Sequence, residues 1–268
     1  MNSFPIQEKG TSTHDDSLRM DNILNSHANY PKMTNHAINP NISVDCVIFG
    51  FGDNNLEVLL IERSPKTTEH EDDLLALPGD LIYEDETLDQ AASRVLKELT
   101  NLENIYLEQV YTFGDPQRIS KPKDILWLQR IREVPQARVI TVAYTSLVKK
   151  EFYKPTPRGF AQNAIWKPID ELPILAFDHN EILQKALNFL KHKIYIEPVG
   201  FELLPKKFTM AQLQRLYEII LQSTLDKRNF RRKILKTSFV VALDEKQKGV
   251  AHKPAMLYKF VKKNFHTI

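Results

Sequence analysis

The stretch GDLIYEDETLDQAASRVLKELTNL, residues 79–102, determines how the first 200 residues are interpreted. It begins as a loop with several acidic side chains and continues as a helical pattern. Thr87 and Gln90 have the spacing of a capping box, in which the two side chains bind each other's backbone N–H groups. The apolar positions that follow recur every three or four residues: Leu88, Ala91, Ala92, Val95, Leu96 and Leu99. A loop followed by a helix with one buried face is therefore predicted.

Strand-like segments lie on both sides of this loop and helix. SVDCVIFGF (43–51) and LEVLLIER (56–63) are rich in β-branched residues and flank the turn GDNN, which predicts a hairpin. Three further strands are predicted within 105–114, 137–148 and 163–172. Residues 117–137 show little periodicity and are predicted to form a surface insertion. A second helix is expected at 178–193, with Asp178 and Glu181 as its capping box.

This order of elements predicts an α+β body, with helices packed on a mixed sheet. Residues 1–40 are polar and aperiodic and are interpreted as a disordered tail. The body is assigned to residues 41–196, and a second domain to residues 197–268 after the Pro- and Gly-containing segment 195–208.

Composition excludes several classes of protein. No stretch of about 18 apolar residues suggests a membrane span, and the N-terminus does not resemble a secretory signal, so a cytoplasmic protein without a membrane partner is expected. The single cysteine, Cys46, excludes an intramolecular disulfide and a zinc site with several thiolates. It lies in an apolar run and is predicted to be a buried core thiol.

Charge is unevenly distributed along the chain. Residues 201–268 contain 15 Lys and Arg against 5 Asp and Glu, a net charge of +10, whereas residues 1–200 contain 21 against 29, a net charge of −8. A basic terminal domain is typical of a protein that binds a polyanion.

The basic domain has the pattern of a winged helix-turn-helix. Thr209 and Gln212 form another capping box and open a helix, the break QSTLD (222–226) follows, and Asp226 is placed to cap a second helix. SFVVALDE (238–245) and AMLYKFV (255–261) are predicted strands around the basic loop KQKGVAHKP, which predicts a wing.

A DNA-contacting surface is predicted on the second helix and on the flanking basic segments. Lys and Arg can neutralise phosphates, while Asn and Arg side chains can also read base edges in the major groove. The predicted contacts are Lys206, Lys207, Lys227, Arg228, Asn229, Arg231, Arg232, Lys248, His252 and Lys253. An ordinary solvated charged surface is the alternative.

Residues 79–102 also resemble a Nudix box, whose helix carboxylates gather magnesium for hydrolysis of a diphosphate. The box is incomplete. Glu86, Arg94, Leu96, Glu98 and Leu102 match it, but Asp80 and Asn101 replace its glycines, and Val95 and Leu99 replace two of its three helix glutamates. Because one remaining helix carboxylate is a poor cage for magnesium, no catalytic residue, metal or cofactor is predicted and the chain is not expected to be an enzyme.

Together, the box remnant and the basic domain resemble the Nudix-related transcriptional regulator family (NrtR), and most closely its arabinose-responsive branch (AraR) of Bacteroides-type bacteria. The segments that carry this resemblance are VDCVIFGF, RVLKELTNLENIYLEQV, ELPILAFDHNEI, EPVGFELLPKKFTMAQLQRLYE and DKRNFRRKI. The resemblance implies a Nudix-like α/β/α sandwich with a mixed sheet, followed by a winged helix-turn-helix.

It also implies a homodimer on palindromic operator DNA and an effector in the Nudix-like domain: a sugar such as L-arabinose or an ADP-ribose-like nucleotide. The effector-binding positions that it suggests are Arg63, Glu86, Arg94, Glu98, Phe113, Tyr144 and Asp178. For Glu86, Arg94 and Glu98, pairing with one another is the structural alternative.

The leading hypothesis is thus an effector-responsive transcriptional regulator, most simply a repressor. An active Nudix hydrolase of ADP-ribose-like compounds with an accessory nucleic-acid domain is the second hypothesis. A third is an adaptor that binds no DNA, which would leave the basic helix without a role.

Overall fold

A mixed sheet of seven strands forms the centre of the body in the computed structural model, which describes residues 36–52, 55–63, 75–197, 199, 203–251 and 253–261. Its strands are β1 Ile38–Phe51, β2 Leu56–Arg63, β3 Leu75–Ala76, β4 Gly79–Tyr83, β5 Glu108–Phe113, β6 Ile140–Lys149 and β7 Ala161–Pro168. The order is β3-β2-β1-β6-β5, and β4 pairs with β1 while β7 pairs with β2. β1 runs parallel to β6, and every other pairing is antiparallel.

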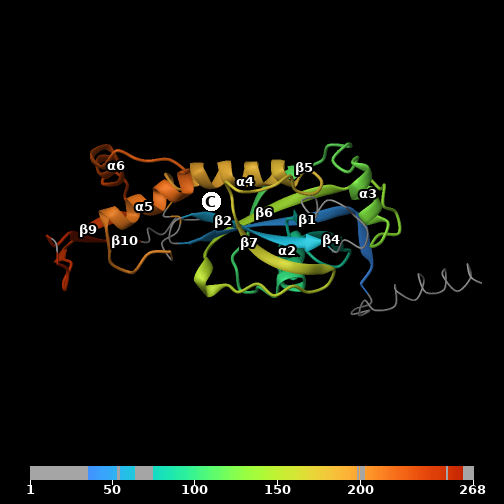
Figure 1. Ribbon diagram of the computed structural model, residues 1–268, viewed down its shortest axis with the longest axis horizontal. Helices are drawn as coiled ribbons and strands as arrows, with labels where there is room; N and C mark the ends of the chain where they lie inside the picture. Colours follow the sequence, from blue (N-terminus) through green and yellow to red (C-terminus); the bar gives the residue numbers. More distant parts are fainter. Residues whose placement is uncertain are drawn as a thin grey trace, which may run out of the picture. The chain divides into compact units, whose positions relative to one another are not determined.

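Two helices cover opposite faces of this sheet (Figure 1). α2 Leu88–Thr100 packs on β1, β4 and β7, and α4 His179–Lys193 packs on β5, β6 and β1. The capping box of Thr87 and Gln90 is present, and the predicted apolar face of α2 is buried apart from the partly buried Leu88. The α/β/α sandwich with a mixed sheet is confirmed.

Two predictions about the ends of elements were wrong. The first strand begins at Ile38 and not after residue 40, because its first residues pair with β4; residues 1–35 of the predicted tail lie outside the described residues. Asp178 precedes α4 but makes no capping hydrogen bond, because its carboxylate binds Arg118 instead.

The predicted surface insertion was also wrong in part. Residues 117–137 include a short helix, α3 Pro122–Leu128, whose Asp124 and Leu128 are fully buried. A polar residue and an apolar residue of the same short helix are buried, so this part of the segment packs against the body, while its other residues are partly or fully exposed. The 3-10 turn η3 Lys150–Phe152 follows β6.

The C-terminal part is a winged helix. α5 Met210–Leu221 and α6 Lys227–Ile234 are joined by a short turn, and β8 Phe208–Thr209, β9 Val240–Lys246 and β10 Met256–Phe260 form a sheet in the order β8-β10-β9. The capping box of Thr209 and the cap of Asp226 are both present. Glu218 accepts the Leu225 N–H at 2.9 Å and the Gln214 amide at 2.9 Å, which fixes the turn between the two helices.

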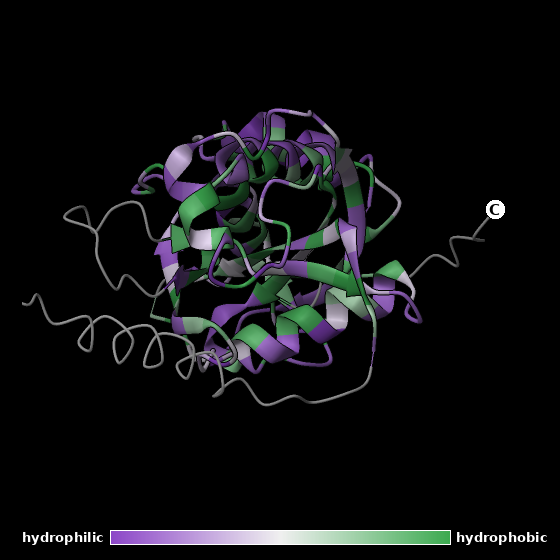
Figure 2. Ribbon diagram, turned by 90° about the vertical axis from the view of Figure 1, so that its right-hand side faces the viewer, coloured by the Kyte–Doolittle hydropathy of each residue, from purple (hydrophilic) through white to green (hydrophobic). Residues whose placement is uncertain are grey.

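One apolar core continues from the body into the winged helix. Leu187, Leu190 and Ile194 at the end of α4 share a buried cluster with Tyr217 of α5 and Phe230 of α6. The Tyr217 hydroxyl donates a hydrogen bond to the Ile194 carbonyl at 2.7 Å. Figure 2 shows apolar positions along the inner faces of the helices that cover the sheet.

Cys46 is a buried core thiol, as predicted; burial raises the pKa of its thiol. Within the described ranges, no helix combines the length and apolar character needed to cross a bilayer.

Candidate functional site

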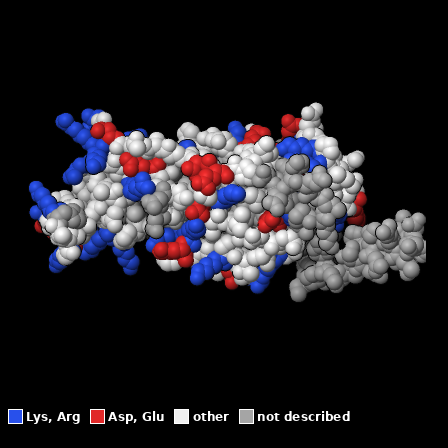
Figure 3. Space-filling view, viewed as in Figure 1, with Lys and Arg blue, Asp and Glu red and all other residues white. Residues whose placement is uncertain are grey.

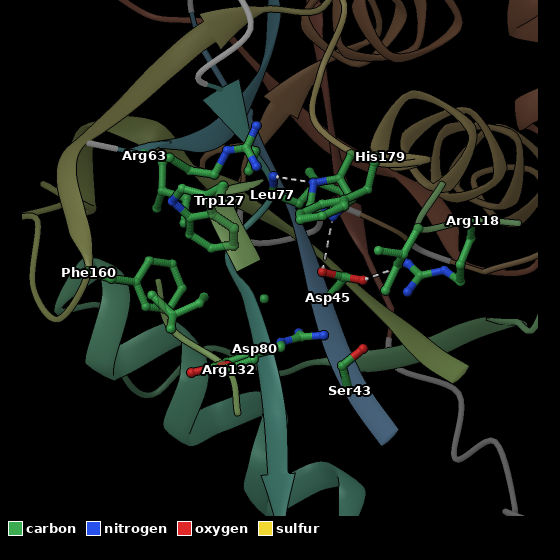
Figure 4. Close-up of a pocket in the computed structure, with 16 residues that line it drawn as sticks. Ser43, Asp45, Arg63, Leu77, Asp80, Arg118, Trp127, Arg132, Phe160 and His179 are labelled. Atoms are coloured by element: carbon green, nitrogen blue, oxygen red, sulfur yellow. Dashed lines mark hydrogen bonds and ion pairs between the residues drawn. The ribbon is translucent and has the colours of Figure 1, made fainter. Parts of the chain in front are cut away.

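A pocket lies between the sheet and the segment that contains α3 (Figure 4). The space open to the centre of a water molecule is small, about 30 Å³, and the whole hollow with its open solvent is about 480 Å³. β1, β2, β4 and the start of α4 contribute one wall, and residues 118–132 contribute another. Its polar and aromatic lining consists of Ser43, Asp45, Arg63, Asp80, Arg118, Trp127, Arg132, Phe160, Phe177 and His179.

Asp45 lies at the centre of the polar wall. It is only 5% exposed and accepts a hydrogen bond from Thr141 at 2.7 Å. Arg118 and the His179 Nε2 approach its two carboxylate oxygens at 3.6 and 3.5 Å. Burial raises the pKa of the Asp45 carboxyl, and the positive charge of Arg118 opposes that rise.

His179 is held in one tautomer. Its Nδ1 accepts a hydrogen bond from the Leu77 N–H at 2.9 Å, so the proton is on Nε2, which faces Asp45. Burial lowers the pKa of His179 to about 3. The ring is therefore neutral at physiological pH.

Two guanidinium groups of the pocket are paired with carboxylates. Arg63 bonds the fully buried Asp124 at 3.3 Å, and Arg118 bonds both oxygens of Asp178 at 2.9 and 2.8 Å. Each pair joins the α3 segment to the body. The Arg63 guanidinium also lies over the Trp127 ring, 4.8 Å from its centroid.

A third guanidinium, that of Arg132, reaches the pocket without such a partner. Its Nε is buried and has no hydrogen-bond partner. Arg132 is close enough to Asp80 and Asp45 for their charges to oppose the effect of burial, which lowers its pKa. In Figure 4, Trp127 and Phe160 border one side of the gap, and Asp45, Arg118 and His179 border the other.

Of the seven predicted effector-binding residues, only Arg63 lines the pocket, while Asp178 orients Arg118 there. Phe113 is a buried core residue. Tyr144 is 1% exposed and donates its hydroxyl to Asp89 at 2.6 Å, and neither residue lines the pocket.

The other three predicted positions form an ion-pair network outside the pocket lining. Arg94 bonds Glu86 at 2.6 and 2.9 Å, Glu98 at 2.9 Å and the Leu81 carbonyl at 3.0 Å. It also lies over the Tyr83 ring. The side-chain hydrogen bond to Arg94 lowers the pKa of Glu86 despite its partial burial. These residues hold the loop before α2 against the helix. They pair with one another, as the structural alternative to effector binding predicted.

The sequence interpretation missed most of the pocket. Asp45 could have been recognised as a candidate site residue, because it is a lone acidic residue in an apolar strand. Arg118, Trp127 and Arg132 lie in the segment taken for a surface insertion, so nothing in the local pattern directed them inward. Asp80 was noted only as a departure from the Nudix box.

The residues at the box helix do not fit a magnesium ion. Val95 and Leu99, at two of the three positions that would need carboxylates, are 0% and 3% exposed and pack in the core. Glu98 is paired with Arg94. Among the described residues, no group of three or more His, Cys, Asp or Glu side chains could hold a metal.

A basic surface covers the winged helix (Figure 3). On α6, the predicted contacts Lys227, Arg228, Asn229, Arg231 and Arg232 are all exposed, while Phe230 and Ile234 are buried, so the two predicted faces of this helix are separate. The Asn229 side chain accepts a hydrogen bond from Arg232 at 3.0 Å.

The remaining predicted contacts differ in their surroundings. Lys248 and Lys253 are exposed on the loop between β9 and β10, and Lys206 is exposed before β8. Lys207 bonds Glu245 of β9 at 2.6 and 2.8 Å, which reduces its charge available to a ligand. His252 lies outside the described residues.

Residues 39–187 match the NUDIX domain, and residues 200–260 match the NrtR DNA-binding winged helix domain. The ADPR responsive transcriptional repressor NtrR of Acinetobacter baylyi is 31% identical over 230 residues, which is 84% of each chain. The chain belongs to the NrtR family.

Solved structures agree with this membership. NrtR of Shewanella oneidensis, in complex with a 27mer DNA, is 27% identical with a TM-score of 0.58, over 82% of this chain and 93% of that chain. A MutT/nudix family protein of Enterococcus faecalis has a TM-score of 0.61 at 20% identity, over 94% and 100% of the two chains, and shows the fold alone. Neither the sequence relative nor these two structures supports the resemblance to the arabinose-responsive branch.

Proposed function

We propose that this protein is a transcriptional repressor that binds operator DNA through its winged helix, and that an ADP-ribose-like nucleotide in the pocket changes its DNA affinity. The observation that carries the effector proposal is the convergence of Arg63, Arg118 and Arg132 with the rings of Trp127 and Phe160 in one pocket. Guanidinium groups bind phosphate oxygens, and aromatic rings stack on bases. A neutral pentose would use the rings and the carboxylates but would leave Arg132 without an anion, since Arg63 and Arg118 are already paired with Asp124 and Asp178.

The DNA-binding part of the proposal is supported by the separate basic and apolar faces of α6. A major groove admits one helix, and the exposed Lys and Arg side chains at the start of α6 suit its phosphates. The match to the NrtR winged helix over residues 200–260 agrees with this interpretation.

The protein would act on DNA as a dimer. A groove between α4 and β6 is lined by apolar side chains that include Tyr106 and Phe152, which are 80% and 70% exposed. A second copy would cover these rings and would place two winged helices on successive half-sites. Sedimentation of the purified protein measures this directly, and a monomer at micromolar concentration would contradict it.

We also propose that the protein does not hydrolyse its effector, because Val95 and Leu99 leave no carboxylate cage on α2. Incubation with ADP-ribose and Mg²⁺ or Mn²⁺ tests this. Turnover that is abolished by Glu98→Gln would support the hydrolase hypothesis instead.

The regulatory proposal is tested with double-stranded DNA that the purified protein selects from a random pool. Fluorescence anisotropy then measures DNA affinity alone, with ADP-ribose and with L-arabinose. We expect ADP-ribose to change the affinity and L-arabinose to leave it unaltered. A response to L-arabinose alone would favour the sugar sensor. If the protein selected no DNA from the pool, the adaptor hypothesis would be favoured.

A further inference from the structure

The three guanidinium groups of the pocket differ in whether they are paired with a carboxylate. Arg63 and Arg118 each have a carboxylate partner within 3.3 Å, Asp124 and Asp178 respectively. Each of these guanidinium groups donates from two nitrogens to its carboxylate and so has already used two of its donors. These two residues therefore join the α3 segment to the body, and their charge is largely neutralised before any ligand arrives.

Arg132 differs from both. It lies in the turn after α3, where its backbone N–H bonds the Leu128 carbonyl at 2.8 Å, so the side chain starts from a fixed point. The guanidinium lines the pocket, and its Nε is buried without a partner. No hydrogen bond or ion pair of its side chain occurs among the described residues.

The neighbouring carboxylates are occupied elsewhere. Asp45 accepts a hydrogen bond from Thr141 and faces Arg118 and His179. Asp80 accepts the N–H of Leu81 at 2.8 Å. Both carboxyl groups have a pKa raised by burial, which weakens their competition for a cation. Arg132 consequently keeps a buried Nε donor without a protein acceptor, and a bound anion would supply one.

A partly buried guanidinium with an unpartnered Nε is costly to a folded protein, since burial removes part of its hydration. Its retention is explained if a ligand supplies the missing acceptors. Resting on the proposed function, we infer that Arg132 binds a phosphate group of the effector directly and takes the place of a divalent metal in holding that anion. The planar fork of a guanidinium matches two phosphate oxygens, which a lysine would not do.

Isothermal titration of the full chain tests the inference with three probes: ADP-ribose, inorganic pyrophosphate and the uncharged adenosine, each with EDTA present. The variants are Arg132→Gln and Arg132→Lys, and the control is Arg130→Gln, an exposed arginine two residues away. We expect Arg132→Gln to weaken ADP-ribose and pyrophosphate binding at least about tenfold. Arg132→Lys should lose less, and Arg130→Gln and adenosine binding should change less than about twofold.

A purely structural role for Arg132 predicts a different result. If Arg132 stabilised the fold, Arg132→Gln would lower the melting temperature of the free protein. We expect the melting temperature to stay equal or to rise, because the variant no longer buries an unpaired charge.

The outcomes separate the inference from the proposed function. ADP-ribose binding that Arg132→Gln leaves intact, or that needs Mg²⁺, overturns the inference and keeps the effector. Pyrophosphate binding that depends on Arg132 without any ADP-ribose binding keeps the inference and rejects the effector. Failure of the wild-type chain to bind either anion, both with EDTA and in a second titration with Mg²⁺, overturns both.

Discussion

Asp45 and Gly79 face each other across the β1–β4 pair, and the pocket depends on the absence of a side chain at residue 79. A Cβ at this position would lie 1.9 Å from the Asp45 Oδ1 and 3.0 Å from the Val44 carbonyl oxygen. The carboxylate could not keep its place beside Thr141 and His179. This glycine is therefore required by contact and not by its backbone angles.

Gly79→Ala is expected to lower the free energy of unfolding by about 1–3 kcal/mol, the usual cost of inserting a methyl group into a filled site. Urea denaturation measures this change. Gly114→Ala is the matched control, since its Cβ would meet only the Ile140 Cγ1 at 3.8 Å. Equal stability of Gly79→Ala and the wild type would show that Asp45 moves without cost.

His179 makes stability depend on pH in the acidic range. Its folded pKa is about 3, and its ordinary value is 6.5. Between these values the unfolded chain binds a proton that the folded chain does not, so stability falls as pH drops below 6.5. At about pH 4.5, two pH units below that value, the loss is about 2–3 kcal/mol from this residue.

His179→Asn keeps an acceptor for the Leu77 N–H and removes the titration. Urea denaturation of both proteins at pH 7 and pH 4.5 should show a smaller loss for the variant. Asp45 and Asp80, whose pKa burial raises, titrate in the opposite sense in both proteins. The difference between the two proteins therefore isolates His179, and equal losses would contradict its neutral state.

At the scale of the element, the side chains of α6 that are available to DNA and those that pack in the core lie on different faces of the helix. Its cations are exposed while Phe230 lies 5.1 Å from the Tyr217 ring, centroid to centroid. Changes on the exposed face should therefore alter DNA binding without altering stability.

Arg228→Ala is expected to weaken binding to the selected DNA and to reduce the slope of log affinity against log salt concentration by about 1, if this side chain neutralises one phosphate. Its melting temperature should equal that of the wild type. Lys154→Ala, an exposed lysine of the body, serves as the control. An unchanged slope for Arg228→Ala would place the DNA elsewhere.

Elements that carry their own signals were predicted well from the sequence. α2 and α5 both begin at capping boxes and bury a regular apolar face, and both are present as expected. α3 was not predicted, because it has seven residues, no side-chain cap and only two buried positions. Its place is decided by Arg63 on a distant strand, which no local pattern could indicate.

The lining of the pocket was predicted less well for the same reason. Glu86, Arg94 and Glu98 stand in one short motif, and the motif gave them a local network. The pocket instead collects single residues from β1, β2, β4, α4 and the α3 segment. Only long-range contacts bring such residues together.

At the scale of the whole molecule, α4 joins the pocket to the winged helix. His179 at its first residue faces Asp45, and Ile194 just after its end accepts the Tyr217 hydroxyl. A ligand that moves the start of α4 would thus bias the packing of α5.

Tyr217→Phe removes this hydrogen bond and is expected to cost about 1 kcal/mol of stability. The ratio of DNA affinities with and without ADP-ribose should also move toward 1, because the two ends of α4 become less tightly coupled. Anisotropy titrations measure both affinities. A ratio equal to that of the wild type would show that α4 does not transmit the signal through this contact.

The shared core also bears on where the chain can be cut. Leu213, Leu216 and Tyr217 are covered in part by α4, which lies outside residues 200–260. A fragment of residues 200–260 would expose these apolar side chains to water and would tend to self-associate. A cut placed ahead of α4, near residue 171, would keep this cover but would expose the side of α4 that packs on β1, β5 and β6, so neither fragment keeps the shared core covered.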